Sequence, residues 1–180
     1  MKEFYKSLYA LLLSPEAKQK YIDAGCSPCR AVMNYKGQYF DAEKYEVFIT
    51  PSALVQYSIA EIEEGKKEAT ITLHLCYEKI LDDSSYSPNL DKALEYHIFN
   101  DVTFALVNRL ETECTGRLRF NSEDQQKNDA IVSVHLMTFT CSFNGRSDGK
   151  NIEYIESENN DLDASGNLVE TDNYNFDVAN

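Results

Sequence analysis

The segment 130–143, AIVSVHLMTFTCSF, constrains the fold of this chain more than any other feature. Most of its fourteen residues are β-branched, aromatic or small polar types, and it contains neither Gly nor Pro. This composition favours a β-strand, which at about 3.3 Å per residue would reach roughly 46 Å. A typical strand has only about 5–6 residues. A strand of that length often projects beyond its own domain, so we expect it to serve contacts between molecules rather than chemistry.

The size and charge of the chain limit the classes of function that it could have. The chain has 180 residues, of which 43% are hydrophobic, and this is enough for one domain with one core. The formal net charge is −13, and residues 148–180 contain nine acidic residues and one lysine. Because affinity for nucleic acids and for anionic membranes depends on Lys and Arg, a chain this acidic is a poor candidate for gripping either. The longest apolar runs are also too short to span a membrane.

The patterning of the first 146 residues predicts an α+β domain. We expect helices at 2–13, 15–23 and 91–111, strands at 30–33, 45–50, 53–59, 69–78 and 117–120, a hairpin tip at 60–68, and a polar loop at 121–129 before the long strand. Residues 69–78 alternate cleanly, with Ile71, Leu73, Leu75 and Tyr77 on one side. The expected fold is a mostly antiparallel sheet flanked by two or three helices.

Residues 147–180 form a second segment of different composition. They are rich in Asn, Asp and Glu, with scattered apolar side chains and no helical or strand period. Alone, such a segment buries too little apolar surface to offset the entropy of ordering. It is therefore either disordered in isolation or an extended acidic arm that orders against a neighbour, with Tyr154 and Phe176 among its anchors.

One motif suggests an alternative, enzymatic function. Cys26-Ser27-Pro28-Cys29 has the spacing of a thiol–disulfide oxidoreductase. Such a motif normally follows a buried strand and opens a helix, whereas here it follows the helix stop at Gly25. His74, His97 and His135 are isolated, and a structural zinc site needs four ligands. We therefore expect no catalytic residue, no metal and no cofactor.

The element order, together with five segments, resembles the tail-terminator and tail-completion proteins of tailed bacteriophages. The segments are 30–38 with NYKGQ, 46–57 with VFITPSALVQY, 69–77 with ATITLHLCY, the helix 94–110, and 124–143. The resemblance implies a virion protein, made in the host cytoplasm, that forms a ring of six or twelve copies in the neck or tail. Such rings join head to tail or end tail growth, contact portal, connector and tail proteins, and let DNA pass through their lumen.

These inferences name candidate interface residues. They lie on the long strand, at the hairpin tip and in the acidic arm: Val132, Val134, Leu136, Thr138, Glu61, Glu64, Lys67, Tyr154 and Phe176. A strand edge that a neighbouring copy extends would supply the contact. A third interpretation also stays open, in which the chain is a cytoplasmic adaptor domain that binds one protein and never enters a particle.

Overall fold

The structure is a computed structural model that describes residues 1–144 except 42–43, 46–47, 81–83 and 127–131. Tyr154 and Phe176, and with them the predicted acidic arm, lie outside the described residues. The described part is an α+β fold with a five-stranded mixed sheet in the order β1-β2-β3-β5-β4. Its elements are α1 (Lys2–Leu12), α2 (Pro15–Ala24), β1 (Ala31–Asn34), β2 (Ser52–Glu63), β3 (Lys66–Tyr77), α3 (Leu90–Val107), β4 (Arg119–Gln125) and β5 (Ser133–Phe143). Only the β1–β2 pairing is parallel; the other three are antiparallel.

Local signals set the bounds of α2. The Ser14 side chain accepts a hydrogen bond from the Ala17 N–H at 3.0 Å, which caps the helix before Pro15 at its first position. Gly25 ends it with a φ of 89°, a left-handed conformation that glycine adopts without steric cost. The expected helix is therefore confirmed at both ends.

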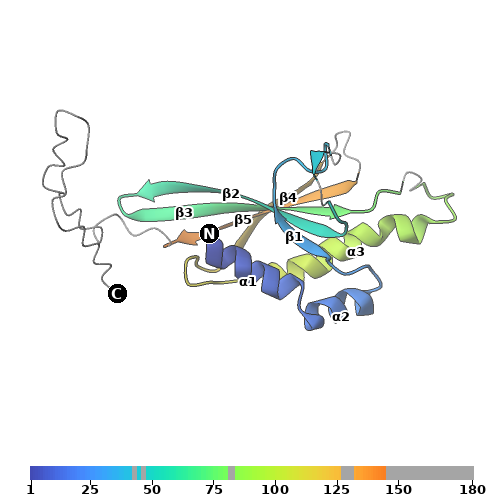
Figure 1. Cartoon of the computed structure of the whole chain (residues 1–180), viewed down its shortest axis with the longest axis horizontal. Helices are drawn as coiled ribbons and strands as arrows, with labels where there is room; N and C mark the ends of the chain where they lie inside the picture. Colours follow the sequence, from blue (N-terminus) through green and yellow to red (C-terminus); the bar gives the residue numbers. More distant parts are fainter. Residues whose placement is uncertain (42–43, 46–47, 81–83, 127–131, 145–180) are drawn as a thin grey trace, which may run out of the picture. The chain divides into compact units, whose positions relative to one another are not determined.

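The main core lies between the helices and one face of the sheet, as Figure 1 shows for α1, α2 and α3. The alternating residues of β3 that point to this helix-covered face are buried as expected: Ile71, Leu73, Leu75 and Tyr77. They pack with aromatic and leucine residues of the helices and with Met137, Phe139, Cys141 and Phe143 of β5. The largest members are Phe4, Leu8, Leu12, Tyr21, Phe99 and Phe139, each fully buried.

A smaller cluster covers part of the opposite face of the sheet. It joins Tyr39 to Leu54, Cys76 and Val134, and Tyr35 and Phe48 pack against it. The rest of this face is rich in hydroxyl groups, with Thr70 paired to Thr140 and Thr72 paired to Thr138 across β3 and β5. We refer to this side of the sheet as the open face, because none of the three helices covers it.

Three expectations about the strands are wrong. The apolar residues at 45–50 do not form a strand where the structure describes them; Phe48 instead packs over the second cluster. The polar segment 121–125 is not a loop but belongs to β4, where pairing with β5 supplies the order. The long strand begins at Ser133 and has 11 residues, so Val132 precedes it in a bend.

Candidate interaction surface

The outer edge of β2 is open over most of its length. β1 pairs only with Ser52–Val55, and no other described strand lies beside residues 56–63 (Figure 1). Burial changes at the same point, because Ser52 to Val55 are buried while every residue from Gln56 to Glu63 except the half-buried Ile59 is exposed. An edge of this kind presents unpaired backbone groups that another strand can extend.

The direction of the backbone groups on this edge follows from one hydrogen bond. The Val55 carbonyl points outward, because it accepts the Tyr35 N–H at 2.9 Å. Backbone groups of alternate residues in a strand point to the same side. Those of Tyr57, Ile59 and Glu61 therefore point outward too, and an added strand would bond to them.

A groove lies beside this edge on the helix-covered side. It has a volume of about 480 Å³ and is lined by the first turns of α1 together with Asn34, Val55 and Tyr57. Lys2 and Lys6 give its rim positive charge, and Lys6 forms a surface ion pair with Glu3 at 3.4 Å. The groove offers apolar surface for a side chain carried by an incoming strand.

The opposite edge of the sheet is β4. All seven of its residues are exposed, and β5 is its only neighbour among the described strands. Phe120 is its one apolar residue and is 42% exposed, although its ring touches Phe104 and Phe139 at centroid distances of 5.2 and 5.9 Å. Arg119 stands at the start of the strand, and Glu123 and Asp124 near its end.

Rows of paired residues cross the sheet from one open edge to the other. On the helix-covered face, Tyr57 is paired with Ile71, Ile71 with Phe139 and Phe139 with Phe120. On the open face, a parallel row contains Ser58, Thr70, Thr140 and Arg119. Each edge therefore ends in a half-exposed aromatic on the same face, since Tyr57 is 48% exposed.

The structure places the candidate interface residues in three different surroundings. Val134 is only 2% exposed within the second cluster, and Val132 and Leu136 are half-buried and pack against that cluster. Thr138 lies on the open face, with its Oγ1 3.3 Å from that of Thr72.

The hairpin tip is tighter than expected, since the turn consists of Glu64 and Gly65 alone. Glu61 accepts the Gly65 N–H at 2.9 Å, and Glu63 forms an ion pair with Lys66. Glu61, Glu64 and Lys67 therefore lie close together at the end of the sheet, where Lys67 is partly buried and the two glutamates are exposed. Ile59 and Phe120 also lie on the two open edges, although neither stands out in the sequence as an interface candidate.

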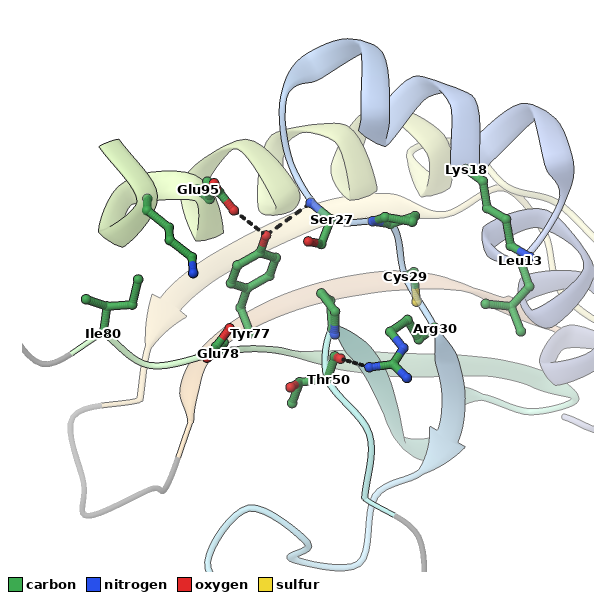
Figure 2. A pocket seen from close by; sticks show the side chains of 13 residues that line it. Leu13, Lys18, Ser27, Cys29, Arg30, Thr50, Tyr77, Glu78, Ile80 and Glu95 are labelled. Carbon is green, nitrogen blue, oxygen red and sulfur yellow. Dashed lines mark hydrogen bonds between the residues drawn. The ribbon is translucent and has the colours of Figure 1, made fainter. Parts of the chain in front are cut away.

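The two thiols of the Cys26–Cys29 motif are buried and not joined in a disulfide. Cys29 lines a pocket of about 690 Å³, in which the Tyr77 hydroxyl accepts the Ser27 N–H at 3.1 Å and donates to Glu95 at 2.9 Å (Figure 2). Burial raises the pKa of Cys26 and of Cys29 to about 11. At that pKa roughly one molecule in ten thousand carries a thiolate at pH 7, and the thiolate is the nucleophile.

The helix preceding the motif has the wrong polarity for a redox thiol. Cys26 follows the C-terminal end of α2, where the helix dipole is negative, whereas reactive cysteines use the positive N-terminal end. The pair therefore lacks the two features that activate such a motif.

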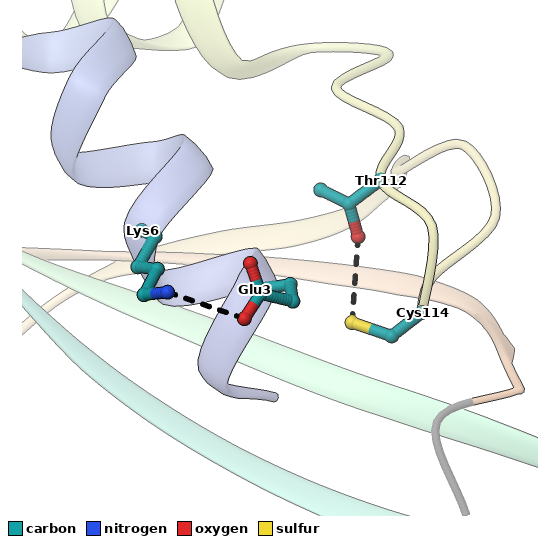
Figure 3. A network of polar contacts seen from close by, with 4 residues as sticks. All are labelled: Glu3, Lys6, Thr112 and Cys114. Atoms are coloured by element: carbon teal, nitrogen blue, oxygen red, sulfur yellow. Dashed lines mark hydrogen bonds and ion pairs between the residues drawn. The ribbon is translucent and has the colours of Figure 1, made fainter. Parts of the chain in front are cut away.

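We predict that thiol titration of the native chain detects Cys114 and not the close pair. Cys114 is partly exposed on the turn at Thr112, with its Sγ 3.5 Å from the Thr112 hydroxyl (Figure 3), whereas the other four thiols are buried. With an aromatic disulfide reagent, one thiol should react quickly and the other four only after unfolding. Cys114→Ser should abolish the fast phase and Cys26→Ser should leave it unchanged. The reverse pattern would revive the oxidoreductase interpretation.

Two further observations concern the described residues only. They contain no cluster of three or more His, Cys, Asp or Glu side chains arranged to hold a metal ion. None of their helices combines the length and the apolar composition that crossing a membrane requires. No protein-family model matches the sequence, and no match is found among curated proteins.

Proposed function

We propose that this chain is a structural virion protein of a tailed bacteriophage that assembles into a ring at the neck or tail. The ring would join head to tail or end tail growth, and DNA would pass through its lumen. Its partners would be further copies of itself and the portal, connector or tail proteins above and below. The bacteriophage context comes from the sequence resemblance, whereas self-assembly has support from the described residues.

The observation that carries the proposal is the pair of open sheet edges. The outer edge of β2 and the edge of β4 lie on opposite sides of one sheet, and each carries a half-exposed aromatic residue. Two different edges on one subunit give a head-to-tail contact, which closes into a ring when the rotation between copies permits. A subunit with one binding edge would stop at a pair.

The acidic charge agrees with this function. The net charge of −13 gives the chain little affinity for phosphates. A channel that DNA must traverse benefits from walls that do not hold it.

The mass of the full chain tests self-assembly directly. We expect native mass measurement to show a species of six or twelve copies that grows with protein concentration, and we expect antibody labelling to place the chain at the neck or tail of purified particles. A monomer or dimer at every concentration, together with absence from particles, would favour the adaptor domain.

A pair of matched tyrosine variants tests the edge. Tyr57 and Tyr9 are 48% and 52% exposed, but only Tyr57 lies on the open edge of β2. Tyr57→Asp should raise the concentration needed for half-assembly at least tenfold, because it places a charge where a strand of the neighbour would dock. Tyr9→Asp should not. Equal effects of the two variants, with both still folded by circular dichroism, would exclude this edge as the contact.

A further inference from the structure

We infer that β4 of one copy pairs antiparallel with the outer edge of β2 of the next copy, with Phe120 opposite Ile59. The inference rests on the proposed self-assembly and adds the identity of the two edges, their direction and their register. It makes the sheets of neighbouring copies continuous.

Hydrogen-bond direction restricts the register first. The outward backbone groups on β2 are those of Tyr57, Ile59 and Glu61, as the Val55 carbonyl shows. At the end of β4, the Gln126 N–H donates to the Val134 carbonyl of β5. The backbone groups of Asp124 and Ser122 therefore also point inward, toward β5. The register shift between Phe120 and Ser122 reverses this alternation. The backbone groups of Phe120 and Glu123 therefore point outward, away from β5. Phe120 can therefore pair with Tyr57, Ile59 or Glu61 but not with the residues between them.

Space then selects one of these three. β1 occupies the edge of β2 up to Val55. With Phe120 opposite Tyr57, Glu123 to Gln125 would all overlap β1, whereas with Phe120 opposite Ile59 only Gln125, the last residue of β4, reaches Val55. With Phe120 opposite Glu61, an aromatic ring would lie against a carboxylate that already caps Gly65. Opposite Ile59, Phe120 meets a half-buried apolar residue that packs against the main core, on the same helix-covered face.

Charge complementarity sets the direction. In the antiparallel arrangement, Glu123 lies opposite Tyr57, beside the groove rimmed by Lys2 and Lys6. Arg119 lies opposite Ala60 on the open face, and the irregularity between Glu61 and Glu63 makes Glu63 the next residue on that face. A parallel arrangement would instead bring Glu123 and Asp124 toward Glu61 and Glu63. Several of these charged groups already have a contact within their own copy: Glu63 with Lys66, Lys6 with Glu3, Arg119 with Glu68 at 3.9 Å and Glu123 with His135 at 3.4 Å. Charge therefore sets the direction of pairing more than its strength.

Disulfide trapping between two variants tests the register. Ala60 and Arg119 are exposed and would form a non-hydrogen-bonded pair, in which Cα atoms of antiparallel strands lie about 4.5 Å apart. The experiment uses the full chain with Cys114→Ser, so that the four remaining native thiols are buried. Mixing Ala60→Cys with Arg119→Cys under mild oxidation should give a covalent dimer, and the double variant should give a ladder of longer oligomers. Neither single variant alone should cross-link.

Two controls make a negative result decisive. Gln19→Cys, exposed on α2, should not cross-link to Ala60→Cys. A dimer of Ala60→Cys alone would mean that two β2 edges pair about a two-fold axis, which overturns the inference. Ring-sized assemblies without cross-links would overturn the register while leaving the proposed function intact. Absence of both cross-links and assemblies would overturn both.

Discussion

Replacing Phe99 with alanine should lower the free energy of unfolding by about 3–5 kcal/mol. The Phe99 side chain is fully buried where α2, α3 and the sheet meet. Its ring stacks on Tyr21 at a centroid distance of 5.3 Å and touches Tyr77 at 5.4 Å. The substitution would leave a cavity between two aromatic rings that are both held by hydrogen bonds, so neighbouring side chains cannot easily fill it. Since domains are stable by only about 5–15 kcal/mol, the loss is a large part of the total.

Urea unfolding followed by circular dichroism at one fixed protein concentration measures this change. Tyr86→Ala serves as the control, because the Tyr86 side chain is 95% exposed. We expect the control to change the free energy of unfolding by less than about 0.5 kcal/mol. If the two variants lost similar stability, Phe99 would not have the central place in the core that the structure gives it.

The elements that the sequence predicts well are those whose signal is local. α2 has a capping serine, a proline at its first position and a glycine after its end, and each acts within a few residues. β3 has one face in the core, so its alternation survives in the sequence as Ile71, Leu73, Leu75 and Tyr77. In both cases, the physics that forms the element is visible in a short window.

The helix α3 shows where periodicity misleads. The helical spacing of apolar residues over 91–111 predicts a buried stripe of Leu94, Ile98, Val102, Ala105, Leu106 and Leu110. Leu94 and Ala105 are exposed instead, and the helix ends at Val107 rather than at residue 111. The buried residues are instead Ala93, Phe99, Asn100, Thr103 and Val107. Apolar residues occur on several sides of this helix, so spacing alone does not determine its orientation. The contacts of Phe99 with Tyr21 and Tyr77 select the buried side.

The candidate interaction surface was harder to predict for a related reason. β4 has the sequence RFNSEDQ, which lacks apolar alternation because no side of it is buried. Its strand conformation depends on residues of β5 that lie 10 to 21 positions further along the chain, and propensity cannot reveal such a partner. The open edge of β2 exists because β1 pairs only with Ser52–Val55, and the length of that pairing is set by the assembled sheet rather than by the residues of β2. The one local indication of this strand was Phe120, a single aromatic residue within a polar segment.

His74 provides the last prediction, because it is buried within a complete set of hydrogen bonds. It is 4% exposed. Nδ1 lies 2.9 Å from the Tyr39 hydroxyl, which donates to the Tyr35 hydroxyl at 3.3 Å, and Nε2 lies 2.9 Å from the Gln56 side-chain oxygen. Tyr35 stacks on the imidazole at a centroid distance of 4.0 Å. No acidic side chain is among these contacts, so they do not offset the cost of burying a charged ring.

Burial accordingly lowers the pKa of His74 from 6.5 to about 4. Between these two values, the unfolded chain binds a proton at this residue and the native chain does not. Stability therefore falls as the pH is lowered through this window, at up to about 1.4 kcal/mol per pH unit. The contribution is fully present above pH 6.5 and is lost by about pH 4.

We expect the native chain to lose about 2 kcal/mol from this histidine between pH 7 and pH 5, and His74→Gln to remove that part of the pH dependence. The glutamine side chain keeps an amide donor for Gln56 and a polar group near Tyr39 but does not titrate. His97→Gln, on the exposed side of α3, serves as the control for the loss of a histidine. Urea unfolding at pH 7, 6 and 5 measures the difference for each variant, independently of its absolute stability. If His74→Gln and the unmodified chain lost stability in parallel, His74 would not be the residue that opposes protonation, and the Tyr39–His74–Gln56 set would be a packing contact without influence on acid stability.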